Sequence, residues 1–196
     1  MPVTINGNGT ITGISAGGLP DGCITADDLA SGAGGKILQV VQQEKLDTWS
    51  TTSDFVFSDV TGLAVTITPS SSSNKVLVLV DVVASSDYWG TYIKLFRNTT
   101  EIGADATGMA SNQTCHFSSI FTNETDSNNN GFTHLHNRQI LDSPNTTSAV
   151  TYKIQSAARS GSFNAYVNRS VADRNHSSGE YDNRYISRIK AIEVAA

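Results

Sequence analysis

The sequence has little of several residue types on which common protein classes depend. It contains only two cysteines, Cys23 and Cys115, with neither the density nor the spacing of a disulfide framework or a zinc site. We therefore expect two inert thiols. Lysine and arginine number 13 against 18 aspartates and glutamates, a net charge of -5 with no basic cluster. This composition argues against a nucleic-acid-binding surface.

Long hydrophobic runs are also missing. The longest, residues 76–84, is interrupted by Asp81 and is far too short to span a bilayer, so we predict no membrane insertion. The first ten residues, MPVTINGNGT, lack the cationic and apolar regions of a signal peptide, and we expect no secretion signal.

The sequence is instead rich in Ser, Thr, Asn, Gly and Val, a composition that favours β-strands joined by polar loops. From Lys36 onward, short apolar segments alternate with turn clusters, as in a sandwich or barrel. We predict an all-β domain over residues 36–196, a jelly-roll-like β-sandwich of eight to ten strands. The predicted strands are 37–43, 55–57, 64–68, 75–84, 91–97, 115–122, 132–141, 149–158, 163–168 and 185–194.

Two of these strands carry further expectations. The segment KVLVLVDVV is nearly continuous in apolar residues, which indicates a strand covered on both faces, with a neighbouring copy of the chain as one source of the second cover. In the last strand, Ile186 and Ile192 share a parity that Ile189 does not. A β-bulge near Lys190 would reconcile the three positions.

Residues 1–35 form a different kind of segment. Residues 3–14 read as a two-stranded hairpin around an Asn-Gly-Asn-Gly turn, and a helix of about two turns starts at the N-cap Thr25 and stops at Gly32. Neither element is stable alone, so we expect this segment to be an adaptor that orders against other chains. Its apolar contacts would come from Ile5, Ile11, Ile14, Leu19, Ile24 and Leu29.

Nearly the whole chain resembles a known group of viral proteins. The stretches INGNGTITGISAGGLPDGCITADDLASGAGGKILQVVQ, YIKLFRNTTEIG, LDSPNTTSAVTYKIQ, YVNRSVADRN and ISRIKAIEV resemble tail-fibre and appendage proteins of tailed bacteriophages, especially those of cyanobacteria and other aquatic bacteria. The resemblance implies a homotrimeric fibre or fibre tip, assembled in the host bacterial cytoplasm and located in the virion. Its N-terminal segment would attach to tail or capsid proteins, while the β-domain faces the host.

Candidate ligand-binding residues gather in three loops. The stretch SSDYWGTY combines aromatic rings with a carboxylate, which suits recognition of a surface sugar. It contributes Asp87, Tyr88, Trp89 and Tyr92. Two polar loops, where recognition residues are often found, contribute Asp126, Asn128, Asp173, Arg174 and Tyr181.

Metal and enzyme chemistry have weaker signals. His134 and His136 are two residues apart, so they share one strand face and could together present six imidazoles around a three-fold axis. No catalytic fingerprint is present, and we expect neither an enzyme nor a cofactor. The sequence favours a virion protein that adheres to host polysaccharide. A capsid or tail decoration protein, and a glycan hydrolase using carboxylates such as Asp87, Asp126 and Asp142, are the alternatives.

Overall fold

The computed structural model describes residues 4–5, 11–12, 36–52, 54–87, 90–107, 109, 114–120, 133–159, 163–174 and 183–196. The chain divides into two compact units, Met1–Lys36 and Ile37–Ala196, one residue from the predicted boundary. In the first unit, β1 (Thr4–Ile5) and β2 (Ile11–Thr12) pair antiparallel with Ile5 opposite Ile11, as the predicted hairpin requires. The predicted helix at 25–32 lies outside the described residues.

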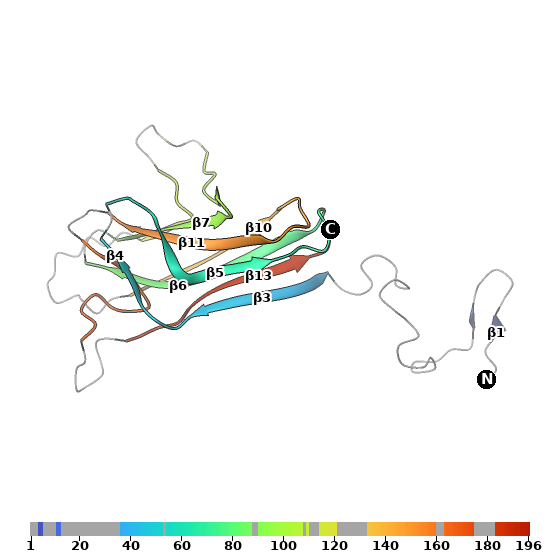
Figure 1. Ribbon diagram of the computed structural model, residues 1–196, viewed down its shortest axis with the longest axis horizontal. Helices are drawn as coiled ribbons and strands as arrows, with labels where there is room; N and C mark the ends of the chain where they lie inside the picture. The colour runs from blue at the N-terminus through green and yellow to red at the C-terminus, as the bar shows by residue number, and fades with distance from the viewer. Residues whose placement is uncertain are drawn as a thin grey trace. The chain divides into compact units, whose positions relative to one another are not determined.

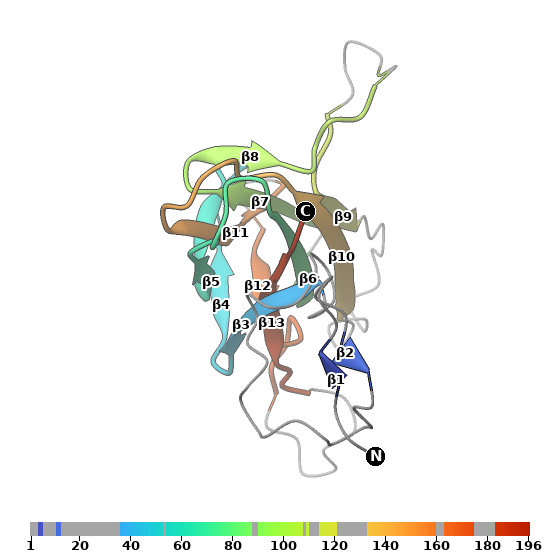
Figure 2. The ribbon, with the colours of Figure 1, turned by 90° about the vertical axis from the view of Figure 1, so that its right-hand side faces the viewer.

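The second unit consists of two antiparallel sheets (Figures 1 and 2). The first sheet has six strands. Five follow the order β3 (Ile37–Lys45), β13 (Ser187–Val194), β6 (Lys75–Ser86), β12 (Ala165–Val167) and β4 (Trp49–Thr51). β13 and β12 pair with one edge of β6, and β10 (His134–Asp142) pairs with its opposite edge. The second has five strands, in the order β5 (Ser58–Ile67), β11 (Val150–Ala158), β7 (Thr91–Arg97) and β8 (Thr100–Ile102), with β9 (Ser118–Ile120) also on β7. The described residues include no helix, and therefore none that could cross a membrane. The predicted all-β, jelly-roll-like sandwich is confirmed, but its described strands number eleven rather than the eight to ten predicted.

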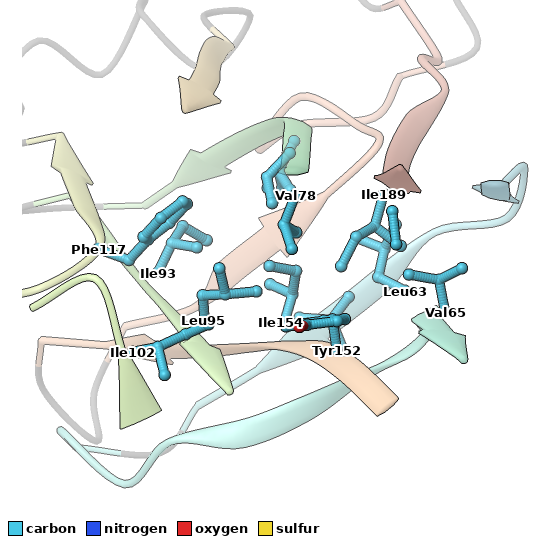
Figure 3. Close-up of a cluster of buried hydrophobic side chains, with 14 of the residues drawn as sticks. Leu63, Val65, Val78, Ile93, Leu95, Ile102, Phe117, Tyr152, Ile154 and Ile189 are labelled. Atoms are coloured by element: carbon cyan, nitrogen blue, oxygen red, sulfur yellow. The ribbon is translucent and has the colours of Figure 1, made fainter. Parts of the chain in front are cut away.

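The core lies between the two sheets, because each long strand alternates buried and outward residues. On β6, Val76, Val78, Val80 and Val82 are buried and face the other sheet, while the residues between them are only half-buried. Figure 3 shows the apolar side chains of both sheets meeting in this space. The cluster includes Leu63, Val65, Val78, Ile93, Leu95, Ile102, Phe117, Tyr152, Ile154 and Ile189.

Some strand predictions need correction. Residues 55–57 form no strand: Phe55 has a φ of 49°, a left-handed conformation that a strand does not accept, and β5 begins only at Ser58. The three-residue strands β4 and β8 were not predicted. The bulge expected near Lys190 is also wrong, since Ile189 faces the core and Ile192 the opposite side in regular alternation. The register of β13 with β3 shifts instead between Glu193 and Val194.

Candidate functional site

Four rings come together on the outer side of the five-stranded sheet. Tyr92 points outward from β7, because its neighbours Thr91 and Ile93 are buried. The ring centroid of Tyr92 lies 5.1 Å from that of Phe55 and 5.1 Å from that of His116, the latter in an edge-on arrangement. The ring of Phe57 lies 5.5 Å from that of His116. We call Phe55, Phe57, Tyr92 and His116 the aromatic cluster.

The backbone around Phe55 explains how the cluster is assembled. Asp54 forms a parallel bridge with Ala158 at the end of β11, and the amide of Phe55 donates a 2.9 Å hydrogen bond to the Ala158 carbonyl. This anchor holds Phe55 in its left-handed conformation with 47% of its surface exposed. A bulky residue with this backbone conformation is strained, and such strain gathers at functional sites.

A charged pair borders the rings. The ammonium of Lys94 on β7 lies 4.5 Å from the ring centroid of Phe57, a cation–π contact, and it also pairs with Glu101 Oε2 on β8 at 2.7 Å. Both side chains are only partly exposed. The pair therefore brings a donor and an acceptor to the edge of an aromatic surface.

Two buried polar atoms in this region have no hydrogen-bond partner within the described part of the chain. These are His116 Nδ1 and Glu101 Oε1, whereas His116 Nε2 is hydrogen-bonded to the hydroxyl of Thr114 at 3.2 Å. Burial lowers the pKa of His116, the charge of Lys94 lowers it further, and Glu101 partly offsets both effects. The ring is therefore neutral near pH 7. Unpartnered buried atoms are uncommon because each one costs free energy, so these two are well suited to bind a ligand's polar groups.

Of the predicted ligand residues that the structure describes, only Tyr92 joins the aromatic cluster. Asp87 binds elsewhere: its Oδ2 accepts hydrogen bonds from the backbone amide of Asn164, at 3.0 Å, and from the Asn164 side chain. Burial, together with the hydrogen bond and charge of Asp87, raises the pKa of Tyr166 to about 12. The guanidinium of Arg169 stacks 4.4 Å above the Tyr166 ring. Asp87 is thus part of a network that fixes the strand β12.

The same network continues to Asp173. Arg184 donates to both carboxylate oxygens of Asp173 at 2.6 Å, and Arg169 Nε approaches Asp173 Oδ2 at 3.6 Å. The carboxylate of Asp173 is therefore occupied by two arginines. Arg174 is exposed. The remaining predicted ligand residues, Tyr88, Trp89, Asp126, Asn128 and Tyr181, lie outside the described residues.

The two histidines proposed for a metal have different surroundings. His136 is buried, with Nε2 hydrogen-bonded to the Thr91 hydroxyl and Nδ1 to the Ser118 hydroxyl, both at 2.9 Å. Neither ring nitrogen of His136 is free for a metal, and His134 is half-buried on the same strand. No group of three metal-ligating side chains occurs among the described residues. Of the predicted attachment residues, Ile5 and Ile11 are paired in the backbone register of the hairpin, whereas Ile14, Leu19, Ile24 and Leu29 lie outside the described residues.

The sequence reasoning missed most of the aromatic cluster. The aromatic residues of the stretch DFVF were assigned to a strand, and no spacing signal connects them with His116 or Tyr92. The thiol of Cys115, next to His116, is free and half-buried, and Cys23 lies outside the described residues.

Comparison with known proteins identifies no family for this chain. No family model matches the chain, and no curated protein matches it. Two solved structures with a similar arrangement are those of the Gt and Gx strains of infectious bursal disease virus. They are 8% and 9% identical to this chain, with TM-scores of 0.36 and 0.34. The alignments cover 80% of this chain but only 42% of those chains, and we take no residue role from them.

Proposed function

We propose that this chain is a structural virion protein, a fibre or fibre-tip subunit of a tailed bacteriophage, that adheres to host surface carbohydrate through the aromatic cluster. The resemblance of the sequence to phage appendage proteins and the division into two units support a virion role. The observation that carries the adhesion site is the exposed ring of Phe55, held on a strained backbone beside Tyr92 and next to the unpartnered atoms His116 Nδ1 and Glu101 Oε1.

The chemistry of these groups matches a sugar. The rings of Phe55 and Tyr92 offer apolar faces to the C–H side of a pyranose. Sugar hydroxyls can donate to the neutral His116 Nδ1 and to Glu101 Oε1 once a rotation of these side chains uncovers the two buried atoms, while Lys94 donates to a sugar oxygen. One such site is weak, and several copies on one particle would raise the overall affinity by multivalency. The homotrimer and the attachment through residues 1–35 remain predictions.

Binding of the full chain to purified host polysaccharide tests the site. We expect Phe55→Ala and Tyr92→Ala each to weaken binding about tenfold or more, equivalent to about 1.4 kcal/mol. Val56→Ala is the matched control, because Val56 lies between the two cluster phenylalanines in sequence, is 63% exposed and contributes no ring to the cluster. Unchanged binding by both ring variants would overturn the site. Antibody labelling of virions tests the tail location, since labelling of the capsid alone would favour a decoration protein.

A further inference from the structure

The outer face of the six-stranded sheet carries side chains in regular rows. Each row runs across β3, β13, β6 and β10, because the four strands pair in register and their alternate residues face the core. The first row is apolar and consists of Val40, Ile192, Leu77 and Leu141. The second consists of Gln42, Lys190, Leu79 and Gln139, and the third of Glu44, Arg188, Asp81 and Asn137.

The apolar row is open to solvent at both ends. Val40 is 53% exposed and Leu141 is 57% exposed, while Ile192 and Leu77 between them are half-buried. A cleft of about 160 Å³ lies over the second and third rows, lined by Gln42, Glu44, Leu79, Asp81, Arg188 and Lys190. Contiguous exposed apolar surface with a polar border indicates an interaction surface.

We propose that this face docks on the same face of a second copy of the chain, around a two-fold axis that runs parallel to the strands between β13 and β6. The charge order supports this occupant. Such an axis keeps each row opposite itself and reverses its order, so Arg188 faces the partner's Asp81 and Asp81 faces the partner's Arg188. Among the described residues Arg188 donates only its Nε, to Glu44 at 2.7 Å, which leaves its Nη atoms for the partner's carboxylate.

The apolar row also matches under this symmetry. The apolar row meets an apolar row, with Ile192 opposite the partner's Leu77 and Val40 opposite the partner's Leu141. In the second row, Gln42 faces the partner's Gln139, an amide pair that can exchange hydrogen bonds. The same axis places Lys190 opposite the partner's Leu79, along which the Lys190 alkyl chain can lie, and Glu44 opposite the partner's Asn137 amide. Aligned packing of two sheets about 10 Å apart is an ordinary arrangement.

The area of this face sets the expected affinity between two copies of the chain. Four strands about 4.8 Å apart, each with about eight residues at about 3.3 Å, give a flat area on the order of 500 Å². Two copies would then bury on the order of 1,000 Å² or more, near the lower bound for specific interfaces. We therefore expect association at micromolar concentration, with an even number of copies in the largest species. That species is a dimer, or a hexamer if residues 1–35 form the trimer proposed above.

The test is a mixing experiment on the full chain, followed by sedimentation equilibrium. In a dimer of Arg188→Asp alone, the new carboxylate of each copy would face the partner's Asp81. In a dimer of Asp81→Arg alone, the new guanidinium would face the partner's Arg188. Each variant alone should therefore show half the mass of the wild type. An equimolar mixture restores both opposite-charge contacts and should restore the wild-type mass. The matched control is the exposed pair of Lys153 and Asp59 on the other sheet, where Lys153→Asp and Asp59→Arg should leave the mass unchanged.

Circular dichroism of each variant checks that the fold is retained. A monomeric wild type at about 100 μM overturns the proposal, and so does a trimer as the largest species. A wild-type mass that neither charge reversal changes overturns it as well, as do variants that stay at half mass after mixing. None of these results bears on the carbohydrate site, which lies on the other sheet and is tested by polysaccharide binding.

Discussion

Arg97 on β7 donates from Nη1 to both carboxylate oxygens of Asp142 at the end of β10, at 2.8 and 2.9 Å. The two residues belong to different sheets, so this contact joins the two layers of the sandwich at one end. Tyr152 on β11 donates its hydroxyl to Asp142 Oδ2 at 2.7 Å, within the core. Burial, then the hydrogen bond to Asp142, raises the pKa of Tyr152 and keeps its hydroxyl protonated as a donor. Both oxygens of Asp142 are thus occupied, which leaves this carboxylate unsuited to cleaving a glycan.

Loss of the Arg97 guanidinium should destabilise the fold more than loss of the Tyr152 hydroxyl. Arg97→Met leaves the buried Asp142 carboxylate without its cation, and we expect a loss of about 3 kcal/mol in the free energy of unfolding. Tyr152→Phe removes a single hydrogen bond to the same carboxylate and should cost about 2 kcal/mol. Urea denaturation measures both values. A Tyr152→Phe variant as stable as the wild type would show that Asp142 does not depend on this hydroxyl.

A second carboxylate, that of Glu193, should make the folding stability sensitive to acid. Glu193 on β13 is buried, and burial alone would raise its pKa. The hydrogen bonds from the side chains of Gln39, Asn74 and Ser70 and from the Ser70 amide outweigh burial and lower the pKa from 4.5 to about 2. The stabilisation is therefore complete above about pH 4.5 and is lost as the pH falls toward 2.

Glu193→Gln separates this contribution from other acid effects. The amide cannot ionise, so the stability difference between wild type and variant should be on the order of 3 kcal/mol at pH 6 and shrink toward pH 2. Denaturant titrations at several pH values give this difference. Lysine variants are poor substitutes, because they would place a cation among the same donors. A difference that stays constant with pH would contradict the assignment.

The long strands could be predicted from the sequence because their patterns are local. The apolar run of residues 76–84 and the Asn-Gly turn of the N-terminal hairpin are visible within a few residues. The short strands β4 and β8 have three residues each, too few to show a period, and they exist only because a partner strand lies beside them. Ile192 was misread for a similar reason, since an apolar residue on an outward face looks the same in the sequence as one in the core.

The candidate site was predictable only in part. Tyr92 was found because an aromatic-rich loop is a compositional signal. Its neighbours Phe55, Phe57 and His116 reach it through the tertiary fold, for which a single sequence has no signal. Asp87 was grouped with Tyr92 because the two are close in sequence, but Gly90 between them has a φ of 111°. Asp87 binds Asn164 instead.

His136 should make the folding stability depend on pH in a range above that of Glu193. Burial, with smaller contributions from His134 and Arg138, lowers the pKa of His136 from 6.5 to about 4. The fold therefore holds the neutral ring, and the unfolded chain takes up the proton first, so stability falls as the pH drops from about 6.5 to about 4. We expect a loss on the order of 3 kcal/mol over this range, which His136→Gln should abolish. An NMR titration of the wild type that places the His136 pKa near 6.5 would contradict this prediction.

Substitution by alanine should reduce the folding stability by different amounts at two glycines with similar backbone conformations. Gly62 (φ 86°) and Gly103 (φ 73°) both lie in the left-handed region, so an alanine at either position is strained by about 1–2 kcal/mol. At Gly62 the added methyl would meet atoms of Lys45 no closer than 3.8 Å, which is ordinary contact. At Gly103 it would lie 2.7 Å from Phe117 Cδ2 and 3.3 Å from Ile140 Cδ1, inside the packed core.

Gly103→Ala should therefore cost about 1–3 kcal/mol more than Gly62→Ala, because the ring of Phe117 has to move within a close-packed interior. Thermal and urea unfolding of the two variants measure the difference, and the shared backbone strain cancels in it. Phe117→Leu in the Gly103→Ala background should recover part of the loss, since the smaller side chain makes room for the methyl. Equal costs at the two glycines would mean that Phe117 is not packed against Gly103 in solution.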